Sequence, residues 1–278
     1  MSPVINLLSD SFGAEILNVS LSLAMSQQQI SYWQDLIFKY QVVVFRNQLL
    51  TPIEQIQVCQ KFGNIEPHPL KYYRGAYPEM TITSNVTDQG EALVHPGPPF
   101  LFWHADGCYL RHPPKFSFFY AHEVPERGGD TLFINTVKAY EDLDSDIKNK
   151  LRDHKAVFGY GPNLMQRCKA KGFEYFIGAE DCRPDVIHPV FRRHPVTGLT
   201  SIFVNETHTD NIIDLDETES NYYLNYLYQH CEQKRYIYTH QYRKNDLVVW
   251  DNNSTIHSGD YLTPIEGRRV MHRVVVRF

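Results

Sequence analysis

Three residues of the chain could together hold one metal ion. His104 and Asp106 are two positions apart in the stretch 102–107, FWHADG. We expect this stretch to be extended, so that both side chains point the same way, because strand side chains alternate between faces. His257, far along the chain, can supply a third ligand from another strand. Two imidazoles and one carboxylate leave other positions of a metal open, which suits a non-haem Fe(II) that must also bind a cosubstrate and O₂.

A His-x-Asp pair alone is a weak signal, since the chain has 13 histidines. The residues that follow His257 strengthen it. Arg269 comes twelve residues later, after a turn with Pro264 and Gly267, and begins an alternating strand pattern. A guanidinium that faces the inside of a barrel needs an anion. The distal carboxylate of 2-oxoglutarate is a suitable partner, because arginine can bind it bidentately.

Arg273 shares the predicted strand face of Arg269 and lies four residues further on. That spacing separates the two side chains by roughly 13 Å at the rise of a strand. The two arginines can therefore serve different anions, one on the cosubstrate and one on the molecule that is oxidised. The alternative is that Arg273 forms an ordinary ion pair with a nearby Asp or Glu.

Composition excludes several other classes of protein. The 278 residues carry a net charge of −5, which gives no reason to expect a nucleic-acid partner. No apolar run is long enough to span a bilayer, and the first residues do not look like a secretory signal. The five cysteines are scattered and never spaced as Cys-x-x-Cys, which argues against a disulfide framework or a structural zinc site. We expect a cytoplasmic protein with free thiols.

The pattern of elements favours a mostly β fold with flanking helices, in one domain that spans residues 1–278. Ser26 and Thr51 are predicted to cap two helices on either side of a buried strand at 42–45. Two further helices are expected near 140–151 and 217–231. Short segments rich in aromatic and branched residues dominate the rest, and we expect strands at 116–120, 131–134, 186–192, 201–204, 236–242, 246–250 and 269–278. Such a series favours a sandwich or jelly-roll barrel.

Several stretches resemble the taurine dioxygenase family of Fe(II)- and 2-oxoglutarate-dependent enzymes, in that family's order and over nearly the whole chain. They are QVVVFR at 41–46, FG at 62–63, WHAD at 103–106, GGDTL at 128–132, HPV at 188–190, RHPVTG at 193–198, FVNE at 203–206, WDN at 250–252 and RRVMHR at 268–273. The resemblance implies a double-stranded β-helix, which is a jelly-roll core with helices packed outside. It also implies that the cofactors are Fe(II), 2-oxoglutarate and O₂.

The resemblance assigns roles to individual residues. It implies three iron ligands, His104, Asp106 and His257. Thr131 and Arg269 match residues that bind 2-oxoglutarate. Arg273 matches the arginine that binds the sulfonate of taurine, and His68 matches a histidine in the substrate pocket.

Three pocket positions depart from the pattern of taurine dioxygenase. Phe100 replaces an asparagine, Lys71 replaces a tyrosine and His208 replaces a phenylalanine. We therefore expect a related pocket with altered selectivity, which binds a small molecule bearing a sulfonate, carboxylate, sulfate or phosphonate. Hydroxylation with release of succinate and CO₂ is the expected outcome.

Three alternatives stay open from the sequence. An enzyme of the same cofactor class could act on an amino-acid-like or natural-product substrate, by desaturation or another oxidation. A jelly-roll protein could bind a ligand without catalysis, although all three candidate metal ligands are present. A zinc hydrolase could use the same His-x-Asp and His, but that interpretation leaves Arg269 and Thr131 without a role. The sequence also leaves a homo-oligomer open.

Overall fold

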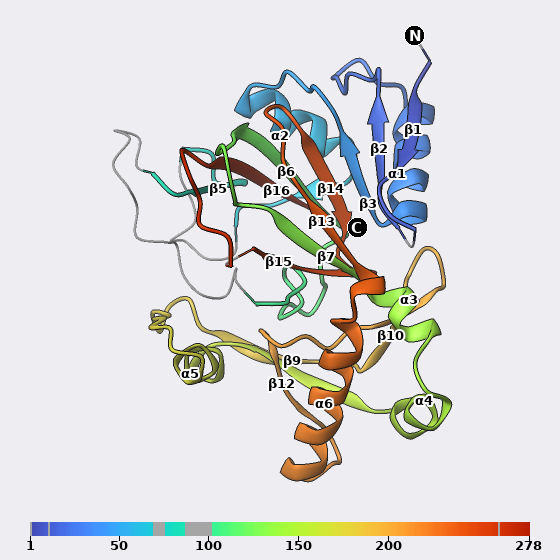
Figure 1. Cartoon of the computed structure of the whole chain (residues 1–278), viewed down its shortest axis with the longest axis vertical. Coiled ribbons are helices and arrows are strands. Elements are labelled where there is room, and N and C mark those ends of the chain that lie inside the picture. Colours follow the sequence, from blue (N-terminus) through green and yellow to red (C-terminus); the bar gives the residue numbers. More distant parts are fainter. Residues whose placement is uncertain (1, 11, 69–75, 87–101, 261) are drawn as a thin grey trace.

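The computed structural model describes residues 2–10, 12–68, 76–86, 102–260 and 262–278. Strands dominate it, and helices pack against their outer faces (Figure 1). The expected fold class, a mostly β double-stranded β-helix with flanking helices, is confirmed. The assignment of residues 1–278 to a single domain stays a prediction. None of the described helices is long and apolar enough to cross a membrane.

A large sheet forms one wall of the barrel. Its strands, in spatial order, are β1 (Val4–Leu7), β2 (Ala14–Leu17), β3 (Val42–Phe45), β14 (Leu247–Asp251), β6 (Phe116–Glu123), β16 (Val270–Arg277) and β4 (Asn64–Ile65), with β5 (Met80–Ser84) also paired to β16. Strands β2 and β3 run parallel, and the other pairs in this sheet are antiparallel. The central strands β14, β6 and β16 come from distant parts of the sequence, so the wall brings residues 116–123 beside the C-terminal stretch.

A small sheet closes the opposite wall. It consists of β13 (Ile237–His240), β7 (Thr131–Asn135) and β15 (Thr255–Gly259), all antiparallel. Phe133 of β7 packs against Trp250 of β14, with ring centroids 5.4 Å apart. Both rings belong to a buried cluster that also contains Phe119 and Met271. This cluster fills the barrel interior and leaves polar side chains at the end where the candidate site lies.

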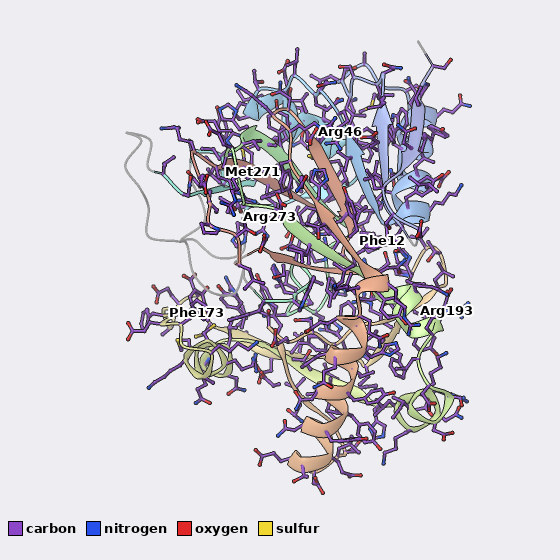
Figure 2. All side chains as sticks on the ribbon, in the orientation of Figure 1. Phe12, Arg46, Phe173, Arg193, Met271 and Arg273 are labelled. Carbon is purple, nitrogen blue, oxygen red and sulfur yellow. The ribbon has the colours of Figure 1, made fainter. Side chains whose placement is uncertain are left out.

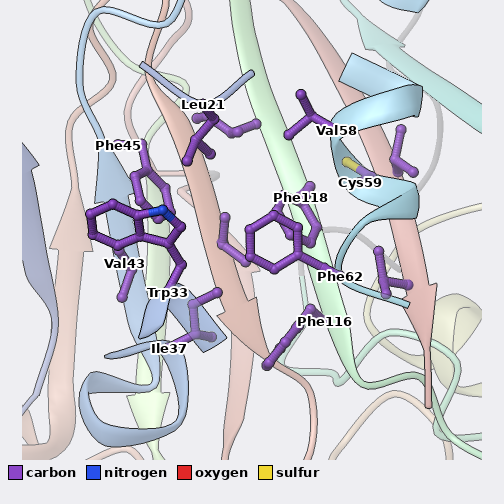
Figure 3. Packing of buried hydrophobic residues seen from close by; sticks show 14 of the residues in the cluster. Leu21, Trp33, Ile37, Val43, Phe45, Val58, Cys59, Phe62, Phe116 and Phe118 are labelled. Atoms are coloured by element: carbon purple, nitrogen blue, oxygen red, sulfur yellow. The ribbon is translucent and has the colours of Figure 1, made fainter. Parts of the chain in front are cut away.

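Two helices cover the outer face of the large sheet. Helix α1 (Gln27–Tyr40) begins with a capping box at Ser26, and α2 (Pro52–Gln60) begins with one at Thr51, as the sequence predicts. The rings of Trp33 in α1 and Phe45 meet edge-on, with centroids 5.6 Å apart. Figure 3 labels both residues in this cluster. The apolar faces of both helices thereby bury the outward side chains of the sheet, which gives the barrel wall a second layer.

A second group of elements lies at one end of the barrel (Figure 1). It contains the sheet β12 (Thr209–Ile212), β8 (Lys155–Tyr160) and β9 (Arg183–Pro189), and the hairpin β10 (Phe191–Arg193) and β11 (Thr200–Ile202). Its helices are α3 (Thr136–Glu141), α4 (Ser145–Leu151), α5 (Pro162–Ala170) and α6 (Glu217–Cys231), and a short 3₁₀ helix spans Lys234–Tyr236. A separate buried cluster joins this group to the segment that carries His104.

Two expected elements are each split in the structure. The predicted helix at 140–151 is two short helices, because Asp144 caps α4 through hydrogen bonds to the N–H groups of Asp146 and Ile147. The predicted strand at 186–192 breaks at Val190, between β9 and β10. The N–H of Val190 donates to the carbonyl of His154, and its carbonyl accepts from the N–H of Phe203, so neither backbone group pairs within a strand. Strand β8 and helix α5 were not expected from the sequence.

The alternation predicted for the last strand is confirmed. Met271 and Arg273 point into the barrel from β16, and Figure 2 labels both on this strand. Val274 and Val276 point outward into the cluster beneath the helices. The strand therefore presents its arginine to the interior, where the surroundings must supply an anion.

Candidate metal centre

His104 and His257 face each other across a single backbone bridge. The N–H of His104 donates to the carbonyl of His257 at 3.0 Å, and the N–H of His257 donates back at 2.8 Å. Directly opposed residues of an antiparallel pair carry their side chains on the same side. The two imidazole rings accordingly lie 4.2 Å apart between centroids. Two residues separated by 153 positions in the sequence are thus brought together by main-chain bonds alone.

Asp106 reaches the same point from a turn. The sequence predicts an extended stretch through both His104 and Asp106, but only His104 pairs with a strand, and the turn begins at Asp106. Gly107 makes this turn possible: its φ of +62° lies in the left-handed region, which favours glycine. A Cβ atom at Gly107 would also meet Cδ of Pro114 at 2.7 Å. The carboxylate is therefore aimed by turn geometry and not by strand alternation.

The three side chains form a donor set that fits a metal. One ligand atom from each of His104, Asp106 and His257 lies within 4.8 Å of the others, and all three residues are buried. Within the described ranges, this is the sole group of three or more His, Cys, Asp or Glu residues whose ligand atoms lie close enough to hold one metal ion. Nδ1 of His104 bonds to the carbonyl of Phe102 at 2.7 Å, which leaves Nε2 as the nitrogen to bind a metal.

The protonation states also suit a cation. Burial lowers the pKa of His104, although Asp106 opposes this effect. Burial and the neighbouring His104 lower the pKa of His257 well below its ordinary value. Burial acts to raise the pKa of Asp106, but Arg273 and the two histidines lower it well below its ordinary value. Neutral imidazoles and an ionised carboxylate are the forms that bind metal ions.

One pocket opens on the Arg269 side of these residues. We call it the Arg269 pocket; it is lined by His104, His257, Thr131, Arg269 and Arg273, among others. Nε of Arg269 donates to the carbonyl of Gly129 at 3.0 Å, and the guanidinium lies 5.8 Å from the centre of the Tyr242 ring. Arg269 makes no ion pair with any residue in the described part of the chain, although burial is costly for such a charge.

Thr131 lines the same pocket, and its hydroxyl is oriented by a residue that the sequence did not single out. The hydroxyl of Tyr242 donates to Oγ1 of Thr131 at 2.8 Å. Burial raises the pKa of Tyr242 to about 12, which keeps this donor protonated. Since Tyr242 donates to Oγ1 of Thr131, the proton of the Thr131 hydroxyl is available to a ligand oxygen in the pocket.

A second pocket opens on the other side of Asp106. We call it the tyrosine pocket; its walls include Tyr109, Tyr160, Tyr175, His68 and His208. The Tyr109 ring lies 4.7 Å from Tyr160 and 4.8 Å from His208, between centroids. The structure therefore brings the predicted pocket residues His68 and His208 to the same cavity. Phe100 and Lys71, also named from the sequence, lie outside the described residues.

Arg273 lines both pockets and forms an ion pair with a candidate ligand. Its Nη1 donates to Oδ1 of Asp106 at 2.5 Å. This pair is the alternative that the sequence left open for Arg273. Among the described residues, the bond to Asp106 is the one hydrogen bond that the Arg273 guanidinium forms, and its Nε is buried without a partner. The pair does not exclude a second anion, because a guanidinium carries five N–H donors.

Sequence reasoning missed residues that support the site. Ser117 donates to Oδ2 of Asp106 at 2.6 Å. A signal for it exists, since it is the one small polar residue in the aromatic run Phe116–Tyr120, on the inward face of β6. Tyr109, Tyr160 and Tyr242 have no comparable signal, because tyrosines are common in this chain and their positions depend on long-range folding.

Comparison with known proteins identifies the family. The sequence matches the family described as "Taurine catabolism dioxygenase TauD, TfdA family" over residues 5–275. The chain belongs to the TauD/TfdA family. It is 30% identical to pentalenolactone F synthase of Streptomyces arenae over 252 residues, which are 86% of this chain and 83% of that protein. It is 28% identical to the alpha-ketoglutarate-dependent 2,4-dichlorophenoxyacetate dioxygenase of Cupriavidus pinatubonensis, with 98% and 97% covered.

A solved structure of the same fold carries a metal. The crystal structure of AAD-2 in complex with Mn(II) and N-oxalylglycine superposes with a TM-score of 0.83 at 25% identity and covers 99% of this chain and 97% of that one. As a member of the TauD/TfdA family, the chain is a dioxygenase and hence an oxidoreductase. It uses Fe(II), 2-oxoglutarate and O₂, as the resemblance implied.

The buried His208 generates a prediction about stability and pH. Burial and the nearby His104 lower the pKa of His208 to about 3. Below about pH 6.5 the unfolded chain binds a proton at this side chain and the folded chain does not, so stability is lost as pH falls. Between pH 7 and pH 5, urea unfolding of the wild type should lose about 2 kcal/mol more than that of His208→Phe. Equal losses in the two proteins would show that His208 titrates normally.

Proposed function

We propose that His104, Asp106 and His257 hold the Fe(II) of this dioxygenase. The observation that carries the proposal is the convergence of their ligand atoms within 4.8 Å, in a buried place that opens to a pocket on each side. Two neutral imidazoles and one carboxylate occupy one face of a metal and leave the rest for other ligands. A structural zinc site would instead close the coordination sphere with four protein ligands.

The Arg269 pocket is the proposed site of 2-oxoglutarate. A dicarboxylate needs a cation for the carboxylate remote from the metal, and Arg269 is a half-buried guanidinium without an ion-pair partner among the described residues. The hydroxyl of Thr131 can donate to the same carboxylate, since Tyr242 is the donor in the bond between the two hydroxyls. Both donors line the pocket that also contains His104 and His257, so one molecule can meet the arginine and the metal together.

The tyrosine pocket is the proposed site of the substrate. Arg273 gives this pocket a positive charge, which favours a small molecule with an anionic group. Tyr109, Tyr160 and His208 present three flat rings in mutual contact, and the low pKa of His208, about 3, keeps its ring uncharged. These faces suit a flat, mainly apolar body. The name of the relative that acts on 2,4-dichlorophenoxyacetate supports an anion of this kind.

The protein's own part in the reaction is to position the reactants and to exclude water. When bound, the iron supplies the oxidising chemistry that uses O₂ and converts 2-oxoglutarate to succinate and CO₂. His104 and Arg273 line both pockets, so the two organic molecules approach the same point from opposite sides. The apolar cluster below the site and the buried state of the ligands limit the access of water.

The proposal is tested by succinate formation under a panel of substrates. With Fe(II) and 2-oxoglutarate, aryloxy carboxylates should stimulate succinate release more than taurine does, because the pocket wall is aromatic. His104→Ala should abolish both metal binding and turnover, since it removes one of the two imidazoles. Mass spectrometry of the products would show the added oxygen. Turnover retained by His104→Ala would contradict the ligand assignment, and a natural-product acid that alone is active would redirect the substrate class.

Gly129 offers a test of the Arg269 pocket that removes no charged group. Its φ of +77° is left-handed, and a Cβ there would lie 2.7 Å from Cδ of Arg269. Gly129→Ala should displace the guanidinium and raise the half-saturating concentration of 2-oxoglutarate about tenfold or more.

Gly198→Ala is the matched control for this substitution. Gly198 has a similar φ of +71°, but a Cβ there meets only Arg193, at 3.5 Å, in the β10–β11 hairpin. Both variants carry the same backbone strain, so only Gly129→Ala should alter the dependence on 2-oxoglutarate. An equal change in both variants would attribute the effect to strain, and no change in either would remove Arg269 from the cosubstrate site.

Substitution of Arg273 should separate its two contacts. Arg273→Leu removes the partner of Asp106 and the proposed anchor of the substrate, so both metal affinity and substrate affinity should fall. Arg273→Lys keeps a positive charge near Asp106 but cannot bind an anion bidentately. It should restore metal affinity while the half-saturating substrate concentration stays about tenfold higher or more. Wild-type substrate affinity in Arg273→Lys would place the anion's anchor elsewhere.

A further inference from the structure

A chain of buried hydrogen bonds ends on the carboxylate of Asp106. Ser117 Oγ donates to Asp106 Oδ2 at 2.6 Å, and Asn252 Nδ2 donates to Ser117 Oγ at 3.0 Å. Nε1 of Trp250 donates to Oδ1 of the same asparagine at 3.0 Å. Trp250, Asn252 and Ser117 are each at most 2% exposed. Water therefore does not compete for these groups, and each bond depends on the next.

The chemistry of Trp250 fixes the direction of the whole chain. An indole N–H can only donate, so the oxygen of the Asn252 amide must face it. The amide nitrogen then faces Ser117 and donates to its oxygen. A serine hydroxyl has a single proton, and because Asn252 already supplies a donor to this oxygen, that proton is directed to Asp106. Without the indole, the amide could turn over and accept the proton of Ser117 instead.

The backbone holds each member of the chain in place. Trp250 of β14 is paired with Ser117 of β6 in the sheet register. Asn252 follows β14 directly, and its N–H donates to the carbonyl of Lys115 at 3.1 Å. The side chain of Asp251 accepts a hydrogen bond from the N–H of Asn253 at 3.0 Å and ties down this turn. The same turn leads into β15, so it relates the support of Asp106 to the position of His257.

We propose that Trp250, Asn252 and Ser117 are positioning residues that fix the rotation of the Asp106 carboxylate for the metal. The proposal rests on the function assigned above to Asp106. Arg273 binds the other oxygen of the Asp106 carboxylate, but it also lines both pockets, where it can bind an anionic ligand. Ser117 lines neither the Arg269 pocket nor the tyrosine pocket. It keeps the carboxylate oriented when Arg273 turns toward a bound anion.

Metal affinity tests this directly, with Mn(II) as the probe and the free ion measured by electron paramagnetic resonance. Ser117→Ala deletes the donor and should weaken Mn(II) binding about 10- to 100-fold, the usual effect of losing a partner of a metal ligand. Asn252→Leu keeps the approximate shape of the side chain and retains Ser117, but it removes the donor that directs the Ser117 proton toward Asp106. It should weaken binding less, by about tenfold at most.

Ser220→Ala is the matched control. Ser220 is also buried, and its hydroxyl oxygen accepts a hydrogen bond from the N–H of Ile212 at 2.9 Å on helix α6, away from the candidate metal ligands. Its loss should lower the melting temperature to a similar extent and leave Mn(II) affinity unchanged. Melting curves of all variants separate a folding defect from a defect in the site.

The outcomes separate this inference from the proposed function. A wild-type protein that binds no Mn(II) would overturn both. Wild-type binding together with unchanged affinity in a folded Ser117→Ala would overturn the positioning role alone. Unchanged affinity in Asn252→Leu, beside weak binding in Ser117→Ala, would overturn the part assigned to Asn252 and Trp250.

Discussion

The backbone bridge between His104 and His257 is the constraint on which the rest of the site depends. Two mutual hydrogen bonds, of 3.0 and 2.8 Å, attach a segment that is otherwise a turn to the edge of the small sheet. Asp106 is placed only because the segment that contains it is held there. The two pockets then open on either side of this junction. The ligands come from distant parts of the chain, yet main-chain hydrogen bonds hold them together. Such bonds form whatever the side chains of the paired residues are.

Charge balance explains why the surroundings of the site are so polar inside an otherwise apolar barrel. Asp106 is a buried anion, and Arg273 compensates it at 2.5 Å. Arg269 is a half-buried cation without an ion pair among the described residues, which makes its surroundings favourable for an incoming carboxylate. The burial of His208 and His257 disfavours their charged forms. The tyrosine pocket also carries other charged side chains: Glu66, Glu79 and Arg277 line it, and Arg277 pairs with Glu66 at 2.8 Å.

Much of this arrangement could be predicted from the sequence, for identifiable reasons. The ligands, Arg269 and Thr131 lie in short motifs, and alternation along the last strand correctly placed Arg273 inside. The extended conformation expected at Asp106 was wrong, because the φ of Gly107 creates a turn that strand periodicity cannot reveal. The ion pair of Arg273 could only be named as an alternative. Contacts such as that between Tyr242 and Thr131 depend on how the segment after β13 packs beside β7, which no local pattern encodes.

The walls of the tyrosine pocket are divided between two parts of the fold. Tyr160 ends β8 and His208 directly precedes β12, two strands of the sheet beyond the barrel, whereas His257 belongs to the barrel's own small sheet. Part of the wall that shapes the cavity for the substrate thus lies in an outer layer, while the proposed metal ligands and Arg273 belong to the barrel and its adjoining turn. Substitutions in the outer layer can change which molecule is accepted while the chemistry beside it stays intact. One scaffold can in this way accept new substrates without any change in its metal ligands.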